Sequence, residues 1–128
     1  MRMKEVFADS GYWIARFNPR DDLHNRALEA ERMCVGAKVV TSDMVLGEFL
    51  NYCAGAPEHI RRLAHNHVKA LRTNSLVIIV RQSRALFDGA FELYGSYIDK
   101  AWSFVDCASF QIMQQRGISH ALAHDHHF

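Results

Sequence analysis

Four acidic residues from distant parts of the chain have the type and the positions that binding of a divalent cation requires: Asp9, Glu48, Asp106 and Asp125. Asp9 directly follows a short apolar run that is typical of a buried strand, and Asp125 comes just after another. Glu48 lies one to two helical turns beyond a third such run. Asp106 lies in the first turn of a predicted helix, on the side that carries most of its apolar residues. Because ligands bind at the carboxyl ends of parallel strands, we expect the four acids at one edge of a sheet.

A cluster of ionised carboxylates needs a compensating charge, because like charges a few ångströms apart raise each other's pKa values. A divalent cation supplies this charge. Mg²⁺ and Mn²⁺ prefer carboxylate oxygens and retain bound water, which can become the nucleophile of phosphodiester hydrolysis. The four acids therefore predict a hydrolase with Mg²⁺ or Mn²⁺ as its cofactor.

Each acid also has a simpler interpretation when it is taken alone. Asp9 suits the N-cap of the helix that follows it, and Glu48 suits a solvated helix surface. Ser103 and Asp106 are spaced as a capping box, in which each side chain accepts from the other residue's backbone N–H. Asp125 suits a terminal turn. The shared position at one sheet edge, and not any single acid, favours the metal site.

Other reactive side chains lack the spacing of a known kind of site. His65, His67 and the histidines of segment 124–127 lack the companion Cys or His residues of structural zinc sites, so we interpret the histidines as solvated. The sequence holds no glycine-rich phosphate loop and no Gly-Xaa-Ser-Xaa-Gly motif. These absences disfavour nucleotide cofactors and serine hydrolysis.

Apolar and amphipathic segments predict strands and helices in turn. Strands are expected at 6–8, 38–40, 76–80 and 121–123, and helices at 11–17, 19–33, 44–53, 57–71, 83–97 and 103–116. The apolar run 76–80 is typical of a parallel strand that is covered on both faces. This order predicts an α/β fold, a three-layer α/β/α sandwich with a mostly parallel sheet of four to five strands. No linker, repeat or low-complexity segment divides the chain, so residues 1–128 are expected to form a single domain.

The composition excludes several classes of protein. The formal net charge of +1 leaves any contact with nucleic acid to a local basic patch. No apolar run approaches the roughly 18 residues of a membrane span, and the first apolar run is too short for a signal peptide. The three cysteines have neither paired nor metal-binding spacing, which favours reduced thiols. We therefore expect a soluble cytoplasmic protein with no membrane partner.

Four segments that contain the acids resemble the PIN-domain ribonucleases, and among these the VapC-type toxins of bacterial toxin–antitoxin pairs. The segments are 7–15 (Phe-Ala-Asp-Ser-Gly-Tyr-Trp-Ile-Ala), 41–51 (Thr-Ser-Asp-Met-Val-Leu-Gly-Glu-Phe-Leu-Asn), 102–107 (Trp-Ser-Phe-Val-Asp-Cys) and 121–128 (Ala-Leu-Ala-His-Asp-His-His-Phe). They occur in the family's order and together span nearly the whole chain. The resemblance implies a PIN-like fold and endoribonuclease activity.

By this resemblance, Asp9, Glu48, Asp106 and Asp125 correspond to the acids that bind Mg²⁺ or Mn²⁺ and activate water for RNA cleavage. Ser10 and Ser103 match small hydroxyl residues beside two of the acids, where hydrogen bonds would support them. Asp99 lies near the third segment but matches no metal-ligand position. The basic residues available to guide the RNA backbone are Arg16, Arg20, Arg61, Arg62 and Arg84.

The resemblance also implies protein partners. Related toxins are usually homodimers, and a short antitoxin inserts a segment into their acidic groove, where an Arg or Lys would compete with the metal. Tyr12, Trp13 and Phe17 on the first two helices are candidates for the apolar surface that such an antitoxin contacts. Because large aromatic side chains are usually buried, packing in the core is the favoured interpretation of these three residues.

Two departures from the family pattern leave other functions open. Ala123 stands where relatives commonly carry Thr or Ser, two residues before the fourth acid. Relatives also continue beyond the segment that here ends at Phe128, so the domain is expected either to lack its C-terminal edge strand or to be trimmed there. The main alternative is a catalytically weakened PIN-like scaffold that acts by binding a partner. A less favoured alternative is an Mg²⁺-dependent phosphatase, which would need an aspartyl nucleophile and a phosphate-binding lysine.

Overall fold

A parallel sheet forms the middle of the molecule. The computed structural model describes residues 3–122, so Asp125 and the rest of segment 123–128 lie outside the described residues. Within that range the strands are β1 (Glu5–Ala8), β2 (Lys38–Ser42), β3 (Val77–Val80) and β4 (Ala121–Leu122). Their order in the sheet is β3-β2-β1-β4, and every neighbouring pair is parallel. The carboxyl ends of these strands therefore lie at one edge.

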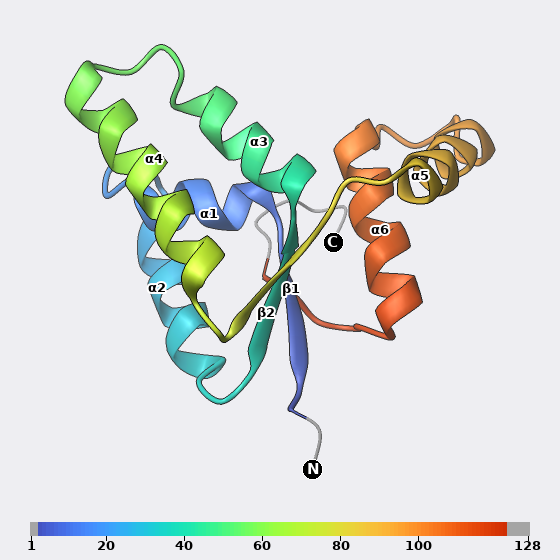
Figure 1. Cartoon of the computed structure of the whole chain (residues 1–128), viewed down its shortest axis with the longest axis horizontal. Coiled ribbons are helices and arrows are strands. Elements are labelled where there is room, and N and C mark those ends of the chain that lie inside the picture. Colours follow the sequence, from blue (N-terminus) through green and yellow to red (C-terminus); the bar gives the residue numbers. More distant parts are fainter. Residues whose placement is uncertain (1–2, 123–128) are drawn as a thin grey trace.

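Two layers of helices cover the sheet (Figure 1). The helices α1 (Ser10–Phe17), α2 (His24–Met33), α3 (Asp43–Tyr52) and α4 (Glu58–Thr73) lie on one side, and α5 (Arg84–Ser96) and α6 (Phe104–Arg116) lie on the other. Each connection between successive strands contains two helices. This arrangement confirms the predicted three-layer α/β/α fold. No helix within residues 3–122 is both long enough and apolar enough to cross a membrane.

The direction of strand addition explains why the helices divide between the two faces. The chain moves from β1 outward to β2 and β3, and then returns to place β4 on the other side of β1. Right-handed crossovers put their helices on opposite faces when the direction of strand addition reverses. The reversal falls beside β1, and in open α/β sheets ligands bind at such a point, at the carboxyl ends of the strands.

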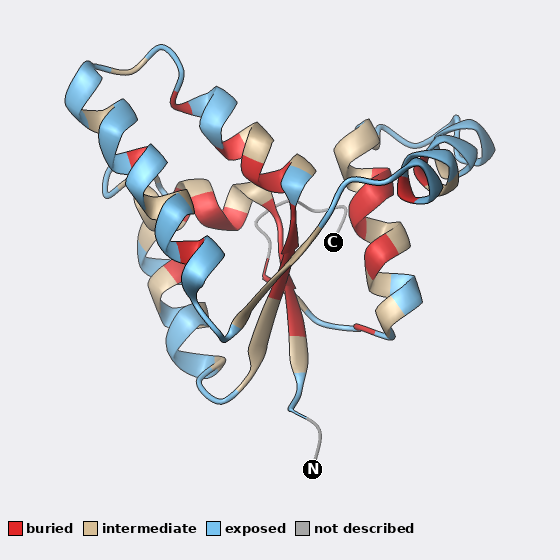
Figure 2. Ribbon diagram, in the orientation of Figure 1, coloured by how far each residue is buried: buried red, intermediate tan, exposed pale blue. Residues whose placement is uncertain are grey.

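The core is centred on β1 and β2. Val6, Phe7, Ala8 and Val40 are almost completely buried, and they form part of the central red region of Figure 2. The prediction that strand 76–80 is covered on both faces is wrong, because Val77–Val80 is only half-buried. The reason is its place in the sheet, since β3 pairs with β2 alone and forms an edge.

Buried aromatic side chains fix α1 on the sheet. Tyr12 and Trp13 are both buried, which confirms the favoured interpretation of these two residues as core. The Trp13 indole Nε1–H donates to Thr41 Oγ1 (3.1 Å), and the Thr41 hydroxyl donates in turn to the Ala8 carbonyl (2.9 Å). These bonds satisfy polar groups inside the core and connect α1, β2 and β1 directly beside Asp9.

The prediction that a helix begins at Pro19 is wrong, because α2 begins at His24. The side chains of Asn18 and Asp21 each accept a hydrogen bond from the backbone N–H two residues further on, at 3.0 Å and 2.9 Å. Such local bonds offer the backbone an alternative to the helix. The segment between α1 and α2 therefore forms turns, and α2 starts later, without a side-chain cap.

The buried face of α6 differs in part from the predicted one. The prediction placed Asp106 on the apolar side of the helix, but Asp106 is only half-buried. The buried residues of α6 are Cys107, Ala108, Ser109 and Ile112. The face is shifted because α6 packs on α5 as well as on the sheet, with Cys107 and Ala108 joining Ala90 of α5 in a small second core.

His67 of α4 is not the solvated histidine that the sequence predicts. Its ring packs among the rings of Trp13, Phe17 and Phe49, with centroid distances of 5.8, 6.0 and 5.5 Å. Its Nε2 atom is buried and has no hydrogen-bond partner among the described residues. Burial lowers the pKa of His67; the charge of Arg16 lowers it further, and Glu31 opposes this shift. Its ring partners come from α1 and α3, which the local sequence of α4 does not reveal.

This environment predicts that His67→Phe reduces the acid sensitivity of folding. Because the pKa is lowered in the folded state, the unfolded state takes up the proton first. The stability gained from neutral His67 is therefore present above about pH 6.5, the unperturbed value, and is lost as the pH falls through the lowered pKa. We expect the urea midpoint of the wild type to fall more between about pH 7.5 and pH 5 than that of His67→Phe. Equal falls in the two proteins would contradict the prediction.

Candidate active site

Asp9 lies at the end of β1, where the sheet reverses its direction of strand addition. It is 6% exposed. Its Oδ1 accepts a hydrogen bond from the Tyr12 backbone N–H (3.0 Å), so it caps α1 as its simpler interpretation predicts. Its own backbone N–H donates to the Leu122 carbonyl (3.3 Å), which links it to β4. These contacts hold the carboxylate in a defined position at the carboxyl edge of the sheet.

Glu48 is brought to Asp9 through Ser10. The Ser10 hydroxyl, which belongs to the residue directly after Asp9, donates a hydrogen bond to Glu48 Oε1. Glu48 is half-buried on α3, whose first turn follows β2 at the same sheet edge. The structure therefore connects Glu48 to the residue that directly follows Asp9. It also gives Ser10 the supporting contact that the family resemblance implies.

Asp106 forms the capping box that its spacing with Ser103 predicts. Asp106 Oδ2 accepts from the Ser103 backbone N–H, and Ser103 Oγ accepts from the Asp106 backbone N–H, both at 3.0 Å. This leaves Asp106 Oδ1 without a hydrogen bond to any residue in the range 3–122. The carboxylate is thus oriented by one oxygen while the other is left for a ligand.

Packing between α6 and α3 holds Asp106 at the same edge of the sheet. Cys107 and Ala108, directly after Asp106, pack with Met44 in the first turn of α3. The loop after β3 joins them, since the Gln82 backbone N–H donates to Asp43 Oδ2 (3.2 Å). The first turn of α6, the start of α3 and the ends of the strands therefore border one region, visible at the upper side of the sheet in Figure 1.

The three described acids do not form a complete metal site by themselves. Among residues 3–122, no group of three His, Cys, Asp or Glu side chains is close enough to hold a metal ion. Mg²⁺ is usually held by one or two carboxylates, and water and substrate phosphates complete its shell. Asp9 and Glu48, which are linked through Ser10 at the carboxyl edge of the sheet, supply carboxylates of this kind. The fourth acid, Asp125, lies outside the described residues, so its place in the site stays a prediction.

The sequence did not single out two charged residues at this edge, Asp43 and Arg81. Asp43 is the first residue of α3, and Arg81 directly follows β3. Both are exposed. Asp9 was selected because it is a charged residue directly after an apolar strand. The same criterion applied to β3 selects Arg81. This arginine adds a positive charge to an edge that the three acids otherwise make negative.

Of the five arginines available to RNA, Arg84 lies nearest to this edge, in the first turn of α5. Arg16 instead makes two hydrogen bonds, both 2.9 Å long, to the Glu31 carboxylate between α1 and α2. Arg62 pairs with Glu58 at the start of α4, which lies away from the sheet edge in Figure 1. The remaining two are Arg20, in the turns between α1 and α2, and Arg61, which donates to a backbone carbonyl beside α4. Asp99 is exposed in the loop before α6.

A parallel α/β/α sandwich with acids after β1, on α3 and at the start of α6 defines the PIN-like class of nucleases. Comparisons with known proteins agree with this class. The crystal structure of the Mycobacterium tuberculosis toxin VapC20, described as cleaving the sarcin–ricin loop, matches with a TM-score of 0.84 and 28% sequence identity, over 94% of this chain and 89% of that chain. VapC20 of the strains H37Rv and CDC 1551, a 23S rRNA-specific endonuclease, is 31% identical over 125 residues, which is 96% of this chain and 91% of VapC20. No protein-family model matches the chain. The chain belongs to the VapC family of PIN-domain toxins.

Proposed function

We propose that this VapC-family toxin is an endoribonuclease that uses Mg²⁺ or Mn²⁺ and holds it with Asp9, Glu48, Asp106 and Asp125. The observation that carries this proposal is the pairing of Asp9 with Glu48 through Ser10 at the carboxyl edge of the sheet. When bound, the cation would supply a water of lowered pKa and neutralise charge on the phosphate. Asp9, Glu48 and Asp106 are the described residues that would hold it.

Hydrogen bonds within the protein orient the three described acids before RNA binds. The Tyr12 backbone N–H orients Asp9, the Ser10 hydroxyl orients Glu48, and the Ser103 backbone N–H orients Asp106. Hydrogen bonds of this kind keep metal-binding carboxylates in place and are important for metal affinity. Arg81 and Arg84 are suited to hold the RNA backbone, because phosphate contacts position a nucleic acid on its protein.

We propose a structured ribosomal RNA as the substrate class. The support is the similarity to VapC20, which is a 23S rRNA-specific endonuclease. An RNA of this class is present in the cytoplasm, and we propose the same compartment for the toxin. A cognate antitoxin is the second partner, and an Arg or Lys on it would pair with the carboxylates of the site.

Incubation of the purified protein with total ribosomal RNA tests the function. We expect cleavage at one or a few positions with Mg²⁺ or Mn²⁺, and none with a chelator. Mapping of the cut ends identifies the substrate. Cleavage that persists undiminished in chelator would contradict the metal proposal. Hydrolysis of a small phosphomonoester without RNA cleavage would favour a phosphatase, and the absence of Mn²⁺ binding at millimolar metal in calorimetry would favour an inactive scaffold.

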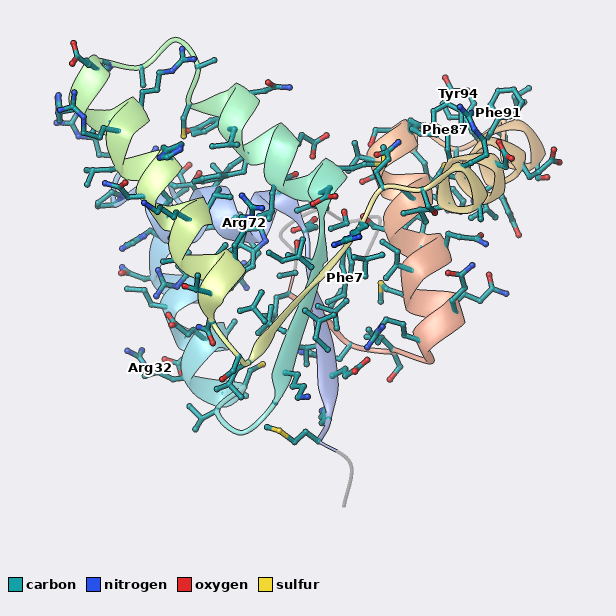
Figure 3. The ribbon with its side chains drawn as sticks, in the orientation of Figure 1. Phe7, Arg32, Arg72, Phe87, Phe91 and Tyr94 are labelled. Atoms are coloured by element: carbon teal, nitrogen blue, oxygen red, sulfur yellow. The ribbon has the colours of Figure 1, made fainter. Side chains whose placement is uncertain are left out.

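We further propose that the toxin is a homodimer that associates through α5. Phe87, Phe91 and Tyr94 follow one another at helical spacing and are 36%, 61% and 51% exposed. Figure 3 shows these side chains close together on α5. Exposed apolar stripes of this kind are typical of protein interfaces. Sedimentation velocity tests the proposal, and a single species with the mass of one protomer would contradict it.

The contact between Ser10 and Glu48 predicts that Ser10→Ala lowers kcat/KM for RNA cleavage by about 10- to 100-fold, the usual effect of removing a residue that orients a metal ligand. Folding is expected to change little, because Asp9 and not Ser10 caps α1. The kinetic measurement is paired with urea unfolding. Ser10→Thr, which keeps a hydroxyl, is the control. Wild-type kcat/KM in Ser10→Ala would show that this bond does not matter for activity.

A further inference from the structure

A hollow of about 330 Å³ lies between the end of α5 and the start of α6, directly beside the capping box of Asp106. Its size falls within the range of small-ligand sites, roughly 300–1,000 Å³. Ser103, which makes two hydrogen bonds with Asp106, forms part of its wall. The other lining residues are Tyr94, Tyr97, Ile98, Lys100, Ala101, Trp102 and Cys107. The hollow therefore opens next to the acid that α6 contributes to the proposed active site.

Aromatic rings supply much of the wall. Tyr97 is 44% exposed and Tyr94 is 51% exposed, so both rings offer free surface. The Tyr97 and Trp102 ring centroids are 4.9 Å apart, and Trp102 also packs edge-on against Phe110 at 4.9 Å. Trp102 is thus held in place from within the protein. Such supported and partly exposed rings suit stacking against a planar ligand.

The charges of the hollow suit a nucleotide. Among the described residues that line it, Lys100 is the one charged side chain, and it is a cation. Cys107 also lines the hollow, and it is completely buried in the small second core with Ala90 and Ala108. Aromatic walls with a nearby cation match a nucleobase with its phosphate, since unpaired RNA bases are bound by stacking on aromatic side chains.

We propose that this hollow binds one unpaired nucleobase of the RNA, adjacent to the phosphodiester that is cut, with Tyr97 and Trp102 as its stacking residues. This inference rests on the proposed ribonuclease function and adds a specificity determinant to it. The base would have to leave its own stack to enter the hollow, which happens most easily in a loop or bulge. The hollow therefore favours RNA whose cut site lies in an unpaired segment.

The test combines a protein variant with an altered substrate. The wild type and Tyr97→Ala are each given an RNA that spans the mapped cut site, and two versions of this RNA that carry one abasic nucleotide, either directly before or directly after the cut. We expect Tyr97→Ala to lower kcat/KM on the intact RNA by about 5- to 150-fold, the range that follows from losing one aromatic–base stack. We expect a similar loss for the wild type on one of the abasic RNAs. On that RNA, the variant should lose almost nothing further.

Two controls separate base binding from general damage. Tyr97→Phe keeps the ring and is expected to cleave like the wild type. Leu63→Ala removes an exposed apolar side chain on α4, on the other side of the sheet, and is also expected to cleave like the wild type. If Tyr97→Ala does not fold, Tyr97→Leu, which lacks the ring but keeps an apolar side chain beside Trp102, replaces it in the same scheme. The inference is wrong if Tyr97→Ala lowers kcat/KM on the abasic RNA by as large a factor as on the intact RNA, because the ring and the base would then act independently. A loss that disappears at higher protein concentration, with slower sedimentation of the variant, would assign the hollow to a second protein copy instead. If the wild type cleaves no RNA, it is the proposed function that fails.

Discussion

Replacing Asp9 with asparagine is expected to lower kcat/KM for RNA cleavage by more than about 100-fold while the protein stays folded. Removing residues that merely orient a metal ligand costs about 10- to 100-fold, so loss of a ligand charge should cost more. Asparagine keeps an oxygen that can accept from the Tyr12 backbone N–H, and Asn is as good an N-cap as Asp. The substitution therefore removes the charge and preserves the helix cap. Cleavage rates on the mapped substrate and urea unfolding measure the two effects.

A surface substitution of the same kind serves as the control for Asp9→Asn. Asp22→Asn also exchanges a carboxylate for an amide, but Asp22 is exposed in the turns between α1 and α2. It is expected to cleave RNA like the wild type. If Asp9→Asn kept more than a tenth of wild-type kcat/KM, Asp9 would be a helix cap and not a metal ligand. If it lost activity together with its cooperative unfolding transition, isothermal Mn²⁺ titration would have to replace the kinetic measurement.

Asp106→Asn is expected to cause a comparable loss of activity, and its comparison with Ser103→Ala separates the two roles of the capping box. An amide at position 106 can still accept from the Ser103 backbone N–H, so the free energy of unfolding should change little. Ser103→Ala removes the acceptor for the Asp106 backbone N–H and should cost about 1 kcal/mol of stability.

Asp106→Asn should therefore have the lower kcat/KM of the two variants, and Ser103→Ala should have the lower free energy of unfolding. Urea unfolding and kcat/KM on the same RNA provide both rankings. Wild-type cleavage by purified Asp106→Asn would show that this residue is a cap and nothing more. The comparison matters because the structure confirms the capping box, and a cap alone would be enough to explain the presence of Asp106.

Most of the sheet and its connections could be predicted from the sequence, because the signals are local. Short apolar runs mark β1, β2 and β3, and polar residues such as Asp9, Ser83 and Ser103 mark helix starts, as the structure confirms. The start of α2 could not be predicted in the same way. Asn18 suits both an N-cap and a local turn, and its side chain in fact accepts from the N–H two residues further on.

Contacts between distant segments account for the rest. The sequence placed Asp9 and Glu48 at one edge, but the hydrogen bond from Ser10 to Glu48 joins α1 to α3 and leaves no local pattern. The environment of His67 is another example, because its aromatic neighbours come from helices elsewhere in the chain. The hollow beside Asp106 likewise arises from the junction of two helices on the far side of the sheet.

The central place of β1 has a consequence for how the toxin is made. Among the described strands β1 is synthesised before the others, yet it pairs with β4, and Glu5 at its start bonds through both carboxylate oxygens to Arg116 at the end of α6. Contacts of such long sequence separation slow folding, because the loop must close before they form. At translation rates of about 5–20 residues per second, several seconds separate the synthesis of Asp9 from that of Asp106. The nascent toxin therefore carries Asp9 for several seconds without the helix that supplies Asp106, so the proposed cleavage site is completed only after α6 has been synthesised.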